Sequence, residues 1–160
     1  MQLQDVLPNE FFKIFNQQIR QKLKEVQVLD HQPYVDLQQI INIIYPNQIT
    51  LLNSTDHPRT RYELAINLGY KLQPSLKDIL LPSTTLLKYR KLAAEGFAKE
   101  ILMPKVILVN LSQQYINKHQ LNAKNLNQFD IDRITQYLAD ELFVPKHILK
   151  YRIKDVNLFI

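Results

Sequence analysis

The sequence RYELAINLGYKLQ, from Arg61 to Gln73, decides the fold class. Its apolar residues recur at helical spacing, and this pattern predicts a helix from about Thr60 to Leu72. Gly69 within it is one of only two glycines in a chain of 160 residues. So few glycines exclude Gly-rich phosphate-binding loops and the Asn-Gly or Asp-Gly turns of tight hairpins. The chain is therefore predicted to be mainly helical.

Other elements are predicted on both sides of this stretch. Before it, one helix follows Asn9 and a second spans about residues 31–45. The segment NQITLLN, residues 47–53, is predicted as a short β segment because Ile49 and Thr50 are β-branched. After it, four further helices are predicted at about Leu86–Leu102, Val106–Lys118, Asp130–Leu142 and Lys146–Ile153.

Composition limits the classes of protein that fit. A hydrophobic content of 46% in 160 residues is enough for one domain with a core, predicted over residues 1–160 with a helical extension at 1–30. The absence of cysteine excludes disulfides and thiolate metal sites and is compatible with a reducing cytosol. No segment has the pattern of a signal peptide or of a membrane-spanning helix. A cytoplasmic protein without a membrane partner is expected.

Three segments, in order, resemble the ImmA/IrrE family of zinc peptidases, which cut repressors of phages, mobile elements and stress regulons. They are RTRYELAINLGYKL (59–72), KLAAEGFAKEILMP (91–104) and ITQYLADELFVPKHILKYRIKDVNLF (134–159). The resemblance covers about residues 33–159. It implies an α+β, mostly helical, zincin-like scaffold with a small β element and a C-terminal helix pair.

The chemical residues of that family are replaced in this chain. Where the family has His-Glu-x-x-His, the sequence places Ile66 and Tyr70 at the ligand positions and Asn67 at the general base. Isoleucine cannot bind zinc, an asparagine amide cannot take a proton near neutral pH, and tyrosine is a poor zinc ligand. The resemblance therefore implies a catalytically inactive pseudopeptidase with no catalytic residue, no metal and no cofactor.

The remaining family positions lie on the next predicted helix. The third ligand, a glutamate in the family, aligns with Lys91, or with Ala93 in a register two residues later. The asparagine that supports the ligands aligns with Glu95. One hypothesis is that Lys91 supplies a fixed positive charge where the metal stood, held by Glu95 or Glu63. The alternative is that Glu63 and Asn67, and Lys91 and Glu95, are solvated pairs at spacing i, i+4.

The histidines offer no replacement zinc site. The chain has four, and none is paired with another three or four residues away: His31, His57, His119 and His147. His57, in the turn before the helix at 60–72, is the nearest to the degenerate site, and an exposed turn position is expected for it.

The resemblance implies a function in regulation through protein–protein interaction. The expected partner is a repressor or other transcription factor of a bacterial prophage or mobile element. One alternative is a DNA-binding regulator, because the C-terminal helix pair has helix-turn-helix spacing with Lys146, Lys150 and Arg152 on its second helix. The other is an active peptidase with an unrecognised site.

Overall fold

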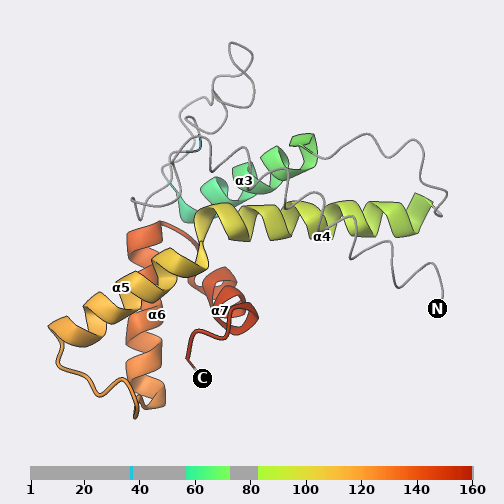
Figure 1. The fold of residues 1–160 in the computed structure, drawn as a ribbon. Helices are drawn as coiled ribbons and strands as arrows, with labels where there is room; N and C mark the ends of the chain where they lie inside the picture. Colours follow the sequence, from blue (N-terminus) through green and yellow to red (C-terminus); the bar gives the residue numbers. More distant parts are fainter. Residues whose placement is uncertain (1–36, 38–56, 73–82, 160) are drawn as a thin grey trace, which may run out of the picture.

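The computed structural model describes Leu37, residues 57–72 and residues 83–159. Leu37 is helical and buried, in the middle of the second predicted helix. Most of the other described residues form helices (Figure 1). These helices are α3 (Pro58–Leu72), α4 (Ser83–Leu102), α5 (Lys105–Lys118), α6 (Gln128–Leu142) and α7 (Lys146–Asp155).

The prediction of an α+β, zincin-like fold is wrong. The described residues are helical and contain no strand. The segment predicted as β, residues 47–53, lies outside them, as do the predicted first helix and the extension at 1–30. The physical reason is that the motifs behind the prediction consist of residues that pack two helices together, such as Gly69 and Ala94. Such residues specify a close helix pair and say nothing about a sheet.

The predicted helix boundaries on both sides of the turns agree with the structure. Pro58 opens α3, and Pro104 and Pro145 precede α5 and α7 in extended backbone conformation. At α6, the Asn127 side chain accepts from the Asp130 amide at 2.9 Å, and the Asp130 carboxylate accepts from the Asn127 amide at 3.2 Å. This capping box fixes the start of α6.

Three helices end without glycine. Gln120, Phe143 and Asn157 each have φ of 52° in the left-handed region, directly after α5, after α6 and near the end of the chain. In each case the amide of the next residue donates to a carbonyl five residues back, at 3.0 or 3.1 Å. These are Schellman motifs, in which glycine is the usual residue. A chain with two glycines therefore closes its C-terminal helices with residues that carry side chains.

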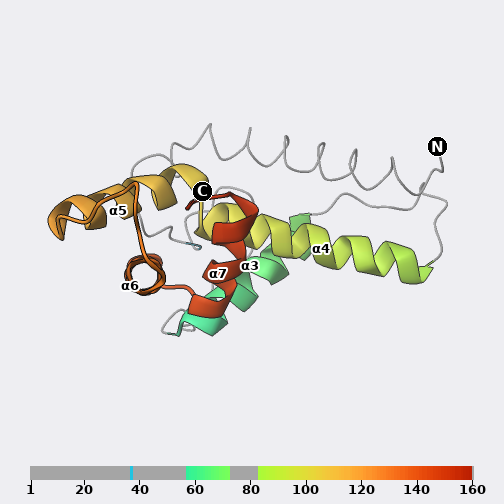
Figure 2. The same ribbon diagram turned by 90° about the horizontal axis from the view of Figure 1, so that it is seen from below.

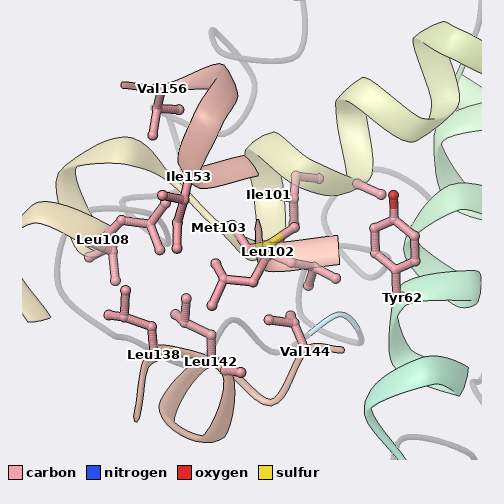
Figure 3. Close-up of a cluster of buried hydrophobic side chains, with 14 of the residues drawn as sticks. Tyr62, Ile101, Leu102, Met103, Leu108, Leu138, Leu142, Val144, Ile153 and Val156 are labelled. Atoms are coloured by element: carbon pink, nitrogen blue, oxygen red, sulfur yellow. The ribbon is translucent and has the colours of Figure 1, made fainter. Parts of the chain in front are cut away.

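The hairpin of α3 and α4 and the group of α5, α6 and α7 meet at the C-terminal end of α4. Figures 1 and 2 show α3 and α4 side by side and antiparallel, with α6 running across the direction of α4. Leu102 and Met103 end α4 in the middle of a buried cluster (Figure 3). Around them lie side chains from α5, α6 and α7: Leu108, Leu138, Leu142, Ile153 and Val156.

Two buried arginines hold these helices together by donating to backbone carbonyls at the C-terminal ends of α6 and α4. Arg61 of α3, 1% exposed, donates from Nη1 to the carbonyl oxygen of Leu142 at 2.6 Å. Arg152 of α7, 7% exposed, donates from Nε to the carbonyl oxygen of Met103 at 3.0 Å. Its Nη2 also lies 3.1 Å from Glu100 Oε1. Carbonyls at a helix end lack intrahelical donors, so each arginine satisfies a group that burial would otherwise leave unpaired.

Candidate functional site

Some of the residues predicted to form a degenerate site lie on one side of α3. Tyr62, Ile66 and Tyr70 follow one another at four-residue spacing, so they form a single stripe along the helix. Tyr62 is buried, whereas Ile66 and Tyr70 are half-buried, and Ile66 packs against the core cluster. This stripe thus passes from the core to the surface along α3.

The α4 residues of the site lie beside this stripe. Burial, and secondly the negative charge of Glu95, raise the pKa of the Tyr62 phenol to about 12. The charge of Glu95 on α4 therefore contributes to the electrostatic environment of Tyr62 on α3. Lys91 Nζ lies 3.9 Å from Glu95 Oε1, one turn along α4. The structure thus pairs Lys91 with Glu95 on α4 and links Glu95 electrostatically to Tyr62 of the α3 stripe.

Two of the predicted site residues lie farther out. Asn67 and Glu63 are exposed on α3. Glu63 accepts from Arg59 Nε at 2.9 Å and is not the partner of Lys91. The Lys91 side chain is 67% exposed, so its long pair with Glu95 contributes little to stability. The side chains at the family's base position and at its third ligand position are thus open to solvent.

The residues that match the family have a packing role. Ala65 and Leu68 are buried in the α3–α4 contact region of the core. A Cβ atom added at Gly69 would lie 2.9 Å from both Cα and O of Ala94, and 3.0 Å from Cδ1 of Phe97. The backbone of α3 therefore approaches α4 so closely that only glycine fits at this position. This close approach gives Ala-x-x-Leu-Gly a purely structural explanation.

No metal-binding constellation exists among the described residues: they contain no group of three or more His, Asp or Glu side chains arranged to hold an ion. His57 is exposed, and its Nδ1 accepts from the Arg59 amide at 3.2 Å, so it caps the start of α3. His119 stacks on Tyr115 with ring centroids 4.2 Å apart, and His147 is exposed. His31 lies outside the described residues.

Open grooves lie elsewhere on the described surface. One lies between α5 and α6, one between α6 and α7, and one where α3 begins beside the turn from α6 to α7. Their lining residues include none of the six predicted site residues.

The three cations proposed for DNA contact are engaged within the protein. Asp132 of α6 binds Lys146 Nζ at 2.9 Å and Lys150 Nζ at 3.3 Å. These two hydrogen bonds hold the pKa of the Asp132 carboxyl below its usual value. Arg152 is buried against Met103 and Glu100. The second helix of the pair therefore does not present a free row of cations.

Sequence reasoning missed Tyr62 and the arginine caps. Tyr62 stands four residues before Ile66, so its place on the same stripe could have been found from spacing alone. The hydrogen bond from Arg61 to the carbonyl oxygen of Leu142 joins residues 81 positions apart, and no local sequence pattern predicts it.

Comparison with known proteins finds no matching family model, no similar curated protein and no similar solved structure. Among the described helices, none combines the length and the apolar character that crossing a bilayer requires.

Proposed function

We propose that the chain is a non-catalytic regulatory protein that binds a protein partner through one surface of the α3–α4 hairpin. This surface, called the α3–α4 face below, consists of Glu63, Ile66, Asn67, Tyr70, Lys91 and Glu95. The carrying observation is that Ile66 and Tyr70, one turn apart and half-buried, are bordered by exposed polar and charged side chains. An apolar and aromatic centre inside a polar rim is the usual composition of a protein-binding surface.

The chemistry of the same residues supports binding over catalysis. Hydrolysis of a peptide needs a nucleophile or an activated water, a base and a group that stabilises negative charge. Isoleucine and asparagine supply neither a metal ligand nor a base, and Lys91 is held at the surface beside Glu95. The partner class follows from the resemblance stated above: a repressor or other transcription regulator.

The proposal is tested by site-specific photo-crosslinking in the host cytoplasm. A benzophenone amino acid replaces Tyr70, and in a matched control it replaces Tyr151, which is 60% exposed on α7. We expect one protein to be crosslinked from position 70 and not from position 151, and mass spectrometry then identifies it. Tyr70→Ala in the purified protein should weaken binding to that partner at least tenfold, in the range of about 1.4 kcal/mol or more.

Two results would reject the proposal. One is the same set of crosslinked proteins from positions 70 and 151. The other is a partner whose affinity is unchanged by Tyr70→Ala while the variant keeps its wild-type melting curve.

A further inference from the structure

The exposed side of α4 next to the α3–α4 face carries a stripe of two lysines and two leucines. Lys88 and Lys91 stand three residues apart, so they lie along one side of the helix. Leu87 precedes Lys91 by one turn, and Leu92 follows Lys88 by one turn. The two leucines therefore border the lysines on either side. This set is called the α4 stripe below.

The leucines of the stripe are unusually exposed. Leu87 is 64% exposed and Leu92 is 43% exposed. A single exposed leucine is ordinary, but two that flank the same cations form an amphipathic surface on α4. Burial of such side chains would gain about 25 cal/mol for each Å² removed from water.

The lysines of the stripe differ from those of α7 in their partners. Lys146 and Lys150 share Asp132. Within the described part of the chain, Lys88 has no ion pair and Lys91 has only the 3.9 Å pair with Glu95. The α4 stripe thus keeps positive charge that the fold does not neutralise.

We infer that the α4 stripe binds an acidic amphipathic helix of the partner, whose apolar side chains cover Leu87 and Leu92 and whose carboxylates pair with Lys88 and Lys91. This inference rests on the proposed function and adds the chemistry of the partner's contact element. The two lysines of the stripe stand three residues apart and the two leucines five residues apart. A helix with apolar residues at three- and four-residue spacing and acidic residues between them presents both kinds of side chain to such a surface.

Charge decides between this occupant and others. A second copy of the chain carries a formal net charge of +5 and is a poor complement to two lysines. A nucleic acid would pair its phosphates with the lysines, but it would leave Leu87 and Leu92 exposed. An acidic helix satisfies both the apolar and the charged parts of the stripe.

The test measures binding of a synthetic peptide by fluorescence anisotropy. The probe is a labelled peptide of about 18 residues, long enough to form a helix, with leucines at three- and four-residue spacing and glutamates between them. A counterpart peptide has lysine in place of each glutamate. We expect the acidic peptide to bind at least about tenfold more tightly than the basic one, and to bind less tightly as salt rises.

Three variants locate the contact. Lys88→Glu with Lys91→Glu should weaken binding of the acidic peptide at least about tenfold, and Leu87→Ala with Leu92→Ala at least about fivefold. The matched control, Lys105→Glu with Lys124→Glu, makes the same change of net charge at exposed positions on α5 and the following loop. It should change binding less than about twofold, because exposed charges at a distance are screened.

Equal weakening by both charge-reversal pairs would overturn the inference, because it would show an effect of net charge alone. Tighter binding of a random DNA duplex than of the acidic peptide would also overturn it. If crosslinking from position 70 yields a partner whose binding is unaffected by changes at Lys88 and Lys91, the proposed function stands and only this inference fails.

Discussion

The α3–α4 hairpin and the α5–α7 unit are held together in different ways. In the hairpin, Gly69 and Ala94 let the two helix backbones approach closely, and the Phe97 side chain packs beside this contact. In the α5–α7 unit, large aliphatic side chains such as Leu138 and Leu149 fill the space between helices. The surfaces differ as well, because α7 pairs its lysines with Asp132 whereas α4 leaves Lys88 without an ion pair among the described residues. Because the helix pair packs through small residues at this contact, its long charged side chains lie on the solvent side, where a partner can bind them.

Removing α6 and α7 would have the largest effect, because it tests whether the two regions are separable. A chain ending at Asn127 loses the acceptor of Arg61, the cap from Arg152 and the aliphatic side chains that cover Leu102. Burying an arginine without its partners costs several kcal/mol, which is a large part of typical domain stability. We expect the truncated chain to show no cooperative thermal transition by circular dichroism. A cooperative melt of the truncated chain would mean that the hairpin region folds alone and that the C-terminal helices are an independent module.

The two regions also differ in how well the sequence predicts them. Helices α3 to α7 follow from apolar spacing and from caps such as Asn127, because these signals are local. If the C-terminal helix pair belongs to the core, the sequence predicts that Leu138, Phe143 and Ile148 are buried. Leu138 is buried, whereas Phe143 and Ile148 are half-buried. Phe143 differs because it takes the left-handed position at the end of α6, which no local pattern predicts in a chain where glycine would be usual.

The helices that carry the candidate site were predictable from the sequence, but the packing around its residues was not. Four-residue spacing places Ile66 and Tyr70 on one stripe, and the structure agrees. Similar residues in a motif do not distinguish a catalytic helix from a helix that packs closely on a neighbour. In this fold Gly69 is required for close packing. The approach of Glu95 to Tyr62 depends on the pairing of two helices, and this distance is absent from the linear sequence.

Gly69→Ala is the sharpest test of the close contact in the hairpin, and Gly96→Ala is its matched control. The added methyl at Gly69 would meet backbone atoms of Ala94 at 2.9 Å, so the helices must separate. We expect a loss of about 1–3 kcal/mol in the free energy of unfolding. At Gly96 no atom lies within 4 Å of the added methyl, and alanine favours the helix by about 0.5–1 kcal/mol.

Urea unfolding of the two variants gives the comparison directly. The same substitution at the only two glycines of the chain should change stability in opposite directions. Equal, small effects at both positions would show that α3 and α4 are not in close backbone contact.

Tyr62→Phe tests whether the Tyr62 phenol is buried beside α4, and Glu95→Gln tests the contribution of Glu95. The pKa of Tyr62 is about 12 in the folded chain against an ordinary value of 10, so the folded chain keeps this proton when the unfolded chain has lost it. Stability from this group is complete below pH 10 and is lost as the pH rises from about 10 to about 12. Over that range we expect the wild type to lose roughly 1–2.5 kcal/mol more than Tyr62→Phe.

The measurement is urea unfolding at pH 9 and pH 11.5, with Tyr151→Phe as the control for an exposed tyrosine. Glu95→Gln should reduce the loss only in part, because burial is the larger cause of the shift. An unchanged pH dependence in Tyr62→Phe would contradict the buried position of this phenol.

Gln120→Gly should have the smallest effect, and it tests a feature of the α5–α7 unit alone. Among the described residues, the three non-glycine residues with positive φ all lie at or after the end of α5, and none lies in the hairpin. A left-handed conformation costs a residue with a Cβ about 1 kcal/mol, and Gln120 is exposed, so glycine relieves strain without removing packing. Because glycine also gives the unfolded chain more freedom, by about 0.4–1 kcal/mol, we expect a net gain of at most about 0.5 kcal/mol. Asn157→Gly is the control, since asparagine tolerates this conformation and should gain less stability from glycine.

A destabilised Gln120→Gly variant would show that α5 does not end in the left-handed turn. The contrast between a strained C-terminal unit and an unstrained hairpin would then not hold.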